Sequence, residues 1–315
     1  MTITRRGFLQ GASAAAALAA SPALAATQQL KFSYQRSSTL LTILKEHKAL
    51  EGKLGPKGFE PAWYLFNDVI SPMTSGAVDF HADVADAVPI FTQAAGAKLT
   101  IYAREAPSPQ AEAIIVHADS SIKTVADLKG KTVAVRRGSG AHFVLAAALK
   151  RAGLSFADIN PAYLAPTDAA PAFERRSIDA WSIWDPFLSI TESRSPSRRL
   201  TDATGLSGYQ RFYLVNDDFV AAHPEVVQIV FDALVEAGKW VKANPKEAAV
   251  FLSPLWGNVP IDVVEAVNSR RSYQVLPVEK SDLGDQQKIA DTFYDAKLIP
   301  RAIDATDVKL WHPKG

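Results

Sequence analysis

Strand patterns alternate with helical patterns along nearly the whole chain. Runs rich in β-branched and aromatic residues at 30–34, 78–82 and 131–135 are each followed by a turn and then by apolar residues at helical spacing. A helix between two strands has to cross one face of their sheet, so this order favours parallel strands. The sequence therefore predicts an α/β fold with a largely parallel sheet.

The pattern divides into two units. The chain passes into a second unit near 116–120, and the strand expected at 210–215 returns to the first. A chain of 315 residues is long enough for two separate cores. We expect one lobe from 27–116 and 216–315, a second lobe from 117–215, and a ligand cleft between them. The strands are expected at 30–34, 58–66, 78–82, 99–103, 113–116, 131–135, 162–164, 178–184 and 210–215, and the helices at 40–50, 68–75, 84–95, 124–130, 140–151, 167–174, 224–244, 245–252, 260–270 and 282–297.

The N-terminus has the features of an export signal. Arg5 and Arg6 precede Phe8 and Leu9, and an alanine-rich run leads to small residues before position 26. This order is typical of a twin-arginine signal peptide, which we predict over 1–26. No later stretch approaches the ~20 apolar residues of a membrane span, so the mature chain is expected to be soluble and periplasmic.

Composition excludes several kinds of chemistry. The chain has no cysteine, which excludes disulfides, thiolate metal sites and cysteine nucleophiles. Its formal net charge of +1 gives no surface for nucleic acid. The six histidines are scattered without metal-ligand spacing, and Ser139 with His142 lacks a third group to orient a catalytic pair. We therefore expect no metal, no cofactor and no enzyme activity.

The turn at 136–142 suggests an anion site. A short strand ends there, and a helix begins within Gly138, Ser139, Gly140, Ala141 and His142. The first N–H groups of a helix lack partners inside the helix and lie at its positive end, and small residues let a ligand oxygen approach them. The alternative is that Ser139 only caps the helix. A similar turn follows the first strand, where Ser37, Ser38 or Thr39 is equally suited to an N-cap.

Five segments resemble the aliphatic sulfonate-binding proteins of ABC importers. The resemblance covers most of 30–220, and related receptors for taurine, nitrate and thiamine precursors share part of it. The segments that carry it are 34–40, 91–97, 122–131, 137–142 and 178–187. It implies a two-lobe periplasmic binding protein fold of type II, a monomer that captures alkanesulfonates for sulfur acquisition and delivers them to permease and ATPase subunits.

The resemblance also implies a head-group site. Such a site would place the sulfonate between the 37–39 turn of one lobe and the 139–142 turn of the other, with the Gln35 amide as a donor. Trp184 would contact the organic tail, with Asp185 beside it, while Trp181 belongs to the core. The expected ligand-binding residues are Gln35, Ser37, Ser38, Thr39, Asp86, Ser139, Gly140, Ala141, His142, Trp184 and Asp185.

Several points stay open at this stage. Asp86 either lines the pocket, facing a cationic or hydroxyl-bearing tail, or caps the helix that follows it. Arg36 and Arg137 either pair with the ligand or lie on the surface. The segment 84–89, one residue longer than the family pattern, together with His81 and Ser38, departs from that pattern and alters the expected tail preference. The alternative ligands are taurine, nitrate or a thiamine pyrimidine precursor.

Overall fold

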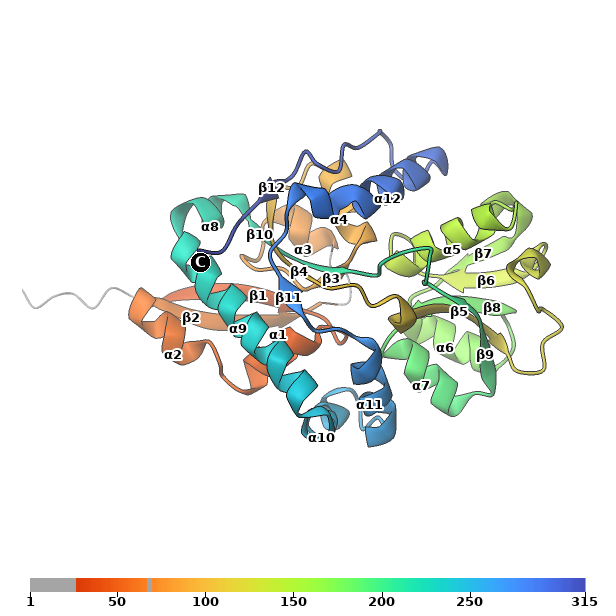
Figure 1. Cartoon of the computed structure of the whole chain (residues 1–315), viewed down its shortest axis with the longest axis horizontal. Coiled ribbons are helices and arrows are strands. Elements are labelled where there is room, and N and C mark those ends of the chain that lie inside the picture. The colour runs from red at the N-terminus through yellow and green to blue at the C-terminus, as the bar shows by residue number, and fades with distance from the viewer. Residues whose placement is uncertain (1–26, 67–69, 315) are drawn as a thin grey trace, which may run out of the picture.

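The structure is a computed structural model that describes residues 27–66 and 70–314. Figure 1 shows two groups of strands, each covered by helices, with the chain crossing between them. The predicted signal peptide at 1–26 lies outside the described residues.

The first group contains both ends of the described chain. β1 (Gln28–Tyr34) pairs in parallel with β2 (Phe59–Leu65). Bridges from Phe80 to Phe32 and Val215 link this pair to a five-stranded sheet with the order β11-β4-β10-β3, in which β12 also pairs with β4. These strands are β3 (Val84–Ala85), β4 (Leu99–Glu105), β10 (Arg211–Asn216), β11 (Val275–Leu276) and β12 (Lys309–Leu310).

The second group is one sheet with the order β7-β6-β8-β5-β9. Its strands all come from the middle of the chain. They are β5 (Glu112–His117), β6 (Thr132–Val135), β7 (Asn160–Tyr163), β8 (Ala180–Trp184) and β9 (Ser197–Asp202).

The prediction of an α/β fold is confirmed, but that of largely parallel sheets is wrong. β10 is antiparallel to β3 and β4, and β5 is antiparallel to β8 and β9. The reason is the double crossing between the sheets. The chain leaves the first sheet after β4 to begin β5, and leaves the second after β9 to begin β10, so these connections lack the crossover helix that keeps neighbouring strands parallel.

Most helices lie where their patterns predict them. The sequence did not reveal α2, α7 and α8 or the strands β3, β9, β11 and β12, and the helix expected at 124–130 is only a 3₁₀ turn. The expected strand at 78–82 contributes only the Phe80 bridges. The first helix ends at Glu46, four residues early, before Lys48 adopts a positive φ of 50°. The helices are α1 (Thr39–Glu46), α2 (Glu51–Leu54), α3 (Ile70–Ser75), α4 (Ala87–Ala94), α5 (Gly140–Arg151), α6 (Pro166–Glu174), α7 (Phe187–Arg194), α8 (Asp217–Ala222), α9 (Pro224–Ala243), α10 (Pro245–Leu255), α11 (Ile261–Arg270) and α12 (Gly284–Asp295), with 3₁₀ turns at Gly55–Lys57, Pro109–Ala111, Val125–Leu128, Phe156–Asp158 and Lys280–Leu283.

Each sheet has its own apolar core. In the first group, α1 and the apolar stripe of α9 pack with β1, and Leu30, Leu40 and Leu234 are fully buried there. In the second, α5 covers one face of β5, β6 and β8, with Leu145 buried, while Trp181 packs near Phe173 of α6 at a centroid distance of 6.2 Å. Two cores of this kind allow the sheets to keep their own shape on either side of a cleft.

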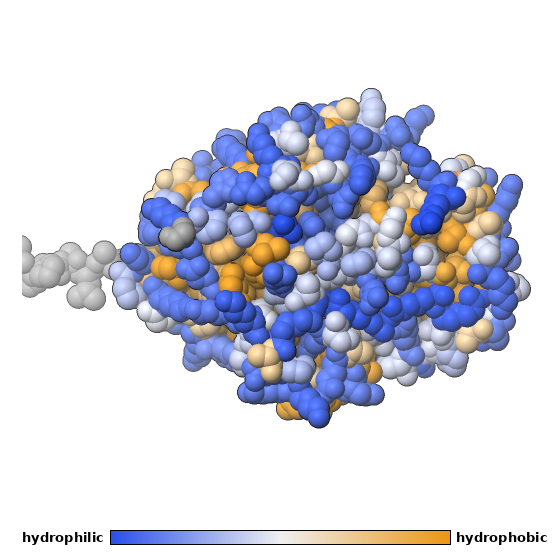
Figure 2. Space-filling view, viewed as in Figure 1, coloured by the Kyte–Doolittle hydropathy of each residue, from blue (hydrophilic) through white to orange (hydrophobic). Residues whose placement is uncertain are grey.

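Helices from the two groups meet on both sides of the junction. α4 and α12 pack on α5, and the Phe293 ring of α12 meets the Phe143 ring of α5 edge-on at a centroid distance of 6.1 Å. On the other side, Arg270 of α11 bonds to Ser189 at 2.8 Å and Glu192 at 3.0 Å on α7. Figure 2 shows a mostly hydrophilic face, with apolar side chains at its lower end where Figure 1 places α10 and α11.

Substitution of Gly238 tests the packing of α9. A Cβ at this position would lie 2.0 Å from the carbonyl oxygen of Tyr273, a backbone atom that has no room to retreat. We expect Gly238→Ala to lower the free energy of unfolding by about 1–3 kcal/mol, although alanine favours a helix. Gly52→Ala is the control, because open space surrounds that position in α2. Equal free energies of unfolding for the two variants, measured by urea denaturation, would contradict this packing.

Candidate functional site

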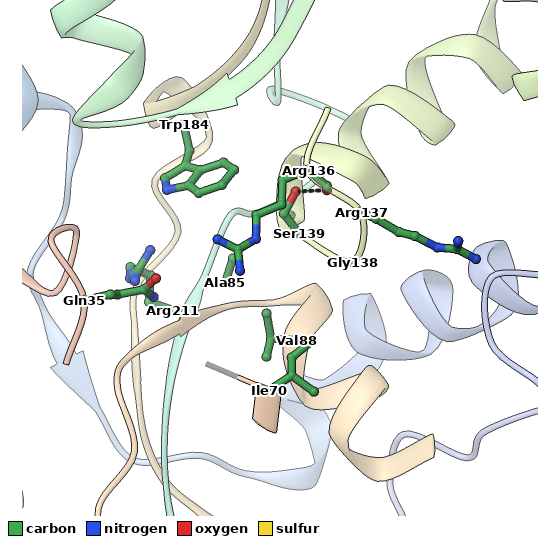
Figure 3. Close-up of a pocket in the computed structure, with 11 residues that line it drawn as sticks. Gln35, Ile70, Ala85, Val88, Arg136, Arg137, Gly138, Ser139, Trp184 and Arg211 are labelled. Atoms are coloured by element: carbon green, nitrogen blue, oxygen red, sulfur yellow. Dashed lines mark hydrogen bonds between the residues drawn. The ribbon is translucent and has the colours of Figure 1, made fainter. Parts of the chain in front are cut away.

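A cavity of about 140 Å³ lies between the two sheets. One wall comes from the first group, with Gln35 after β1, Ala85 of β3 and Val88 of α4. The other comes from the turn between β6 and α5 and from Trp184 at the end of β8 (Figure 3). Strand ends and helix starts therefore meet here, which is where α/β proteins bind ligands.

The start of α5 supplies unpaired amide donors. Ser139 is its N-cap: its hydroxyl accepts from the His142 N–H at 3.2 Å and donates to the Arg136 carbonyl at 2.7 Å. Ser139 lines the cavity, but its hydroxyl is fully used in the cap. Within the part of the chain that the structure describes, the N–H groups of Gly140 and Ala141 have no acceptor. At a helix N-terminus, such groups favour an anion.

Glycine is required at both positions flanking Ser139. Gly138 has a φ of 77°, in the region that disfavours other residues. A Cβ on Gly140 would lie 2.9 Å from Oε1 of Glu112 and 3.1 Å from the Cβ of Ala85. The small residues of this turn thus let the two lobes approach each other as well as leaving space for a ligand.

His142 supports the turn from inside. It is fully buried, and its Nδ1 accepts from the Gly138 N–H at 3.1 Å. Its ring meets Phe156 at 5.0 Å and Phe293 at 5.7 Å. Burial, with the charge of Arg137, lowers the pKa of His142 to about 4, so the ring is neutral and acts as an acceptor. His142 does not line the cavity.

The first-lobe turn is also divided between lining and support. The Gln35 side chain lines the cavity and donates to the Asp83 carbonyl at 3.1 Å. Ser38 accepts from the Gln35 N–H at 3.2 Å, and Thr39 lies 3.2 Å from the Tyr273 hydroxyl. Ser38 and Thr39 are both buried and hold the turn, whereas Ser37 lines an adjoining cavity.

The adjoining cavity has a volume of about 210 Å³. It shares Gln35, Arg136 and Trp184 with the first cavity and adds the apolar side chains of Phe66 and Phe187. Trp184 therefore lies on the boundary between the two spaces. Trp181 is buried in the second core, as expected.

Asp185 lies behind the cleft rather than in its wall. It is buried, accepts from the Ser189 N–H at 2.9 Å and hydroxyl at 2.6 Å, and pairs with Arg270 at 3.4 Å. Burial raises its pKa, and the Arg270 charge opposes the rise. Its side chain joins α7 to α11 across the junction of the two lobes.

Asp86 neither lines the pocket nor caps the helix that follows it, the two alternatives that the sequence left open. It occupies the N-cap position of α4 without a side-chain capping bond, and it does not line either cavity. Its Oδ2 instead accepts from the Ser207 hydroxyl at 2.7 Å. Burial raises the pKa of Asp86 to about 6, and the Ser207 bond works in the opposite direction.

The structure thus places Gln35, Ser139, Gly140 and Trp184 in the main cavity wall and Ser37 in the adjoining one. The other expected site residues lie behind these walls. They are Ser38, Thr39, Asp86, Ala141, His142 and Asp185.

Two arginines of the wall were missed by sequence reasoning. Arg136 and Arg137 both line the cavity. Figure 3 shows the Arg136 guanidinium directed into it, whereas that of Arg137 is directed away and lies 5.7 Å from the Tyr163 ring. Arg211 at the start of β10 is buried and ion-pairs with Asp83, 128 residues away. The adjacent arginine pair was visible in the sequence, but which one faces the cleft depends on where α5 starts.

The described ranges, 27–66 and 70–314, hold no group of histidine and acidic side chains that fits a metal ion. None of their helices has the length and apolar character needed to cross a membrane.

Two α/β lobes, joined by two crossing segments around a cleft, define the class of bilobal periplasmic binding protein folds. A family model described as NMT1/THI5 like matches residues 66–248. A putative aliphatic sulfonates-binding protein of Escherichia coli is 34% identical over 98% of this chain and 94% of its own length. The chain therefore belongs to the NMT1/THI5-like family and, within it, to the aliphatic sulfonate-binding proteins.

Two solved structures agree with this placement. The periplasmic aliphatic sulphonate binding protein SsuA from Escherichia coli superposes with a TM-score of 0.82 at 34% identity, over 91% of this chain and 92% of that one. The alkanesulfonate-binding protein SsuA from Xanthomonas axonopodis pv. citri, bound to MOPS, gives 0.81 at 33% identity, over 89% and 96% of the two chains. The resemblance predicted from the motifs is confirmed.

The neutral state of His142 predicts a loss of stability in acid. Its pKa of about 4 in the folded chain lies below the ordinary value of about 6.5 for histidine, so the unfolded chain takes up the proton first as the pH falls. Stability should fall from about pH 6.5 towards pH 4, by about 3 kcal/mol for this group. In His142→Asn, which keeps an acceptor for Gly138, urea denaturation should show a smaller fall; an equal fall would contradict a neutral buried ring.

Proposed function

We propose that this protein captures aliphatic sulfonates outside the cytoplasmic membrane and delivers them to an ABC importer. The observation that carries the proposal is the pair of unpartnered N–H groups at Gly140 and Ala141, beside the Arg136 guanidinium and the Trp184 ring in one cleft. The names of the relatives, which bind sulfonates or hold MOPS, support the same ligand class.

The donors suit the head group. A sulfonate carries one negative charge over three oxygens and stays ionised at any physiological pH, so it needs hydrogen-bond donors rather than a proton acceptor. Amides at the start of α5, the Gln35 amide and Arg136 offer such donors around one space. Arg211 adds positive charge, but its ion pair with Asp83 neutralises most of it.

The apolar wall suits an organic tail. Trp184, Ile70 and Val88 line the head-group cavity, and the adjoining cavity continues past Trp184 to Phe66 and Phe187. Burial of a tail against these side chains is worth about 25 cal/mol per Å² of apolar surface. The tail therefore supplies affinity, while the head group fixes the orientation.

The alternative ligands fit less well. Nitrate has no tail for Trp184, and the ammonium group of taurine would meet Arg136 and Arg211 near the cleft. A thiamine pyrimidine precursor would leave the amide donors of α5 without an anion. An enzymatic role is also not proposed, since the chain has no cysteine nucleophile and the relatives named above are binding proteins.

The remaining parts of the proposal concern export and assembly. The twin arginine at Arg5 and Arg6 supports export of the folded chain to the periplasm. There we expect a monomer without a cofactor, whose two lobes, one with β10 in its sheet and one with β5 in its sheet, close on the ligand and present it to permease and ATPase subunits.

Calorimetric titration of the purified protein tests the ligand class. The panel is ethanesulfonate, longer alkanesulfonates, MOPS, taurine, nitrate and sulfate, each in a buffer without a sulfonate group. We expect tight binding of the organic sulfonates and little response to nitrate or sulfate. Silence of every sulfonate would overturn the proposed function.

The neighbouring arginines form a matched pair of variants. Arg136→Gln removes a charge that faces the ligand, so every sulfonate should bind more weakly by about 1.5–3 kcal/mol. Arg137→Gln removes the same charge from a side chain that points away, and its affinity should change little. Equal losses in the two variants, measured by calorimetry, would mean that only the net charge of the cleft matters.

Trp184 should act on the tail alone. We expect Trp184→Ala to reduce the affinity for long alkanesulfonates by up to about 3 kcal/mol and to affect ethanesulfonate much less. Trp181→Ala is no control, since it would disrupt the core. The same calorimetric series decides the point: a loss that does not vary with tail length would rule out this contact.

A further inference from the structure

Two acidic side chains lie directly behind the anion site, on the far side of Gly140. The Cβ position of Gly140 is 2.9 Å from Oε1 of Glu112 and 3.2 Å from Oδ1 of Asp86. Both residues are almost fully buried, at 0% and 2% exposure. Only one glycine therefore separates these carboxyl groups from the proposed ligand space.

These carboxyl groups lack the partners that a buried charge needs. Three of their four oxygens have no hydrogen-bond partner within the residues that the structure describes. These are Oε1 and Oε2 of Glu112 and Oδ1 of Asp86. Ser207 bonds to the other Asp86 oxygen, and the nearby backbone N–H groups of Ala87 and Gln210 also favour the ionised form of Asp86, but burial outweighs these effects. An unpaired ionised carboxylate is very costly in such a place, so the uncharged acid is favoured.

The surrounding charges do not remove that cost. Arg211 favours ionisation of Glu112, but Asp83 already pairs with it. Asp285 of α12 opposes ionisation of Asp86, and the Asp86 charge opposes that of Glu112. On the side of α5, His142 is neutral, while Arg136 and Arg137 flank the turn. The groups that interact with the pair are Ser207, Tyr209, Arg211 and Asp285. Asp83 acts through its ion pair with Arg211, and Arg136, Arg137 and His142 belong to the adjoining turn.

We propose that Asp86 and Glu112 bind a proton together when a sulfonate binds at the start of α5, so that anion capture and proton uptake are coupled. This inference rests on the proposed function. The physical reason is that the ligand stays ionised while the two acids are able to lose their charge. A bound anion repels carboxylates behind Gly140, and protonation removes that repulsion.

The coupling also spans the two lobes. Asp86 belongs to the segment between β3 and α4, whereas Glu112 starts β5 and pairs in register with Trp184 of β8. Ser207, which holds Asp86, lies on the crossing segment from β9 to β10. A negative charge on the pair therefore opposes the close approach of the lobes, and uptake of a further proton by the pair favours it.

The sign of the pH effect follows. Burial raises the pKa of Asp86 to about 6 and that of Glu112 well above its usual range, and a bound anion would raise both further. Affinity should be highest in mild acid and fall as the pH rises, by at most about tenfold per pH unit for one proton. Proton uptake on binding should be greatest where the affinity changes most steeply.

The first measurement is the number of protons taken up when ethanesulfonate is added to the protein in unbuffered salt solution. The second is the Kd for ethanesulfonate, measured by calorimetry between about pH 5.5 and pH 8.5 in imidazole, bis-Tris and Tris. We expect the wild-type protein to take up about half a proton or more per ligand near neutral pH. Asp86→Asn, which mimics the protonated form of the acid that is still ionised near neutral pH, should take up less than half of the wild-type amount and bind with a flatter pH dependence. Asp119→Asn, an exposed change in the lobe that contains Glu112, should behave as wild type.

Each outcome decides a different point. Sulfonate binding without proton uptake, or uptake that persists in the Asp86→Asn, Glu112→Gln double variant, would overturn this inference and leave the proposed function intact. No sulfonate binding across the pH range would overturn the proposed function itself. Because the wild-type measurement stands alone, a variant that fails to fold still leaves the inference falsifiable.

Discussion

The cleft depends on a buried ion network where the chain leaves and re-enters the first sheet. Arg211 at the start of β10 pairs with Asp83, and Arg271 before β11 pairs with Glu105 at the end of β4 at 2.7 Å. Tyr213 donates to the same Glu105 at 2.8 Å. These groups are buried, so each needs the others, and removing one partner would leave an uncompensated charge. The network therefore fixes both crossing segments relative to the sheet.

That rigid junction allows weak donors to form a site. The amide pair at the start of α5 belongs to one lobe and Gln35 to the other, and neither group carries a full charge. Their value depends on the separation of the lobes, which in this structure is maintained by the packing of α4 and α12 on α5 and by the Arg270 contacts to α7. Binding residues in such a protein are few, whereas those that support them are many, and His142, Ser38 and Asp185 belong to the second kind.

The same arrangement explains why some sequence predictions identified the right segment but the wrong atoms. The turns at 35–39 and 136–142 do meet at the cleft. Within them, however, Ser139 uses its hydroxyl as a cap, and Ser38 and Thr39 bond to neighbours inside the lobe. A residue type indicates which bonds are possible, but the nearest partner in three dimensions decides which one forms. Arg211 was missed for this reason, because its partner Asp83 is remote in sequence.

The sequence by itself determined the alternation of strands and helices, the two turns that face each other and the family. These depend on local residue spacing and on short motifs that members of the family share. Only the tertiary structure decided the strand directions, which of two adjacent arginines faces the ligand, and the placement of Asp86 and Glu112 behind Gly140. The physical reason is that those features arise from contacts between segments far apart in the chain, and burial changes both the direction and the charge state of the side chains involved.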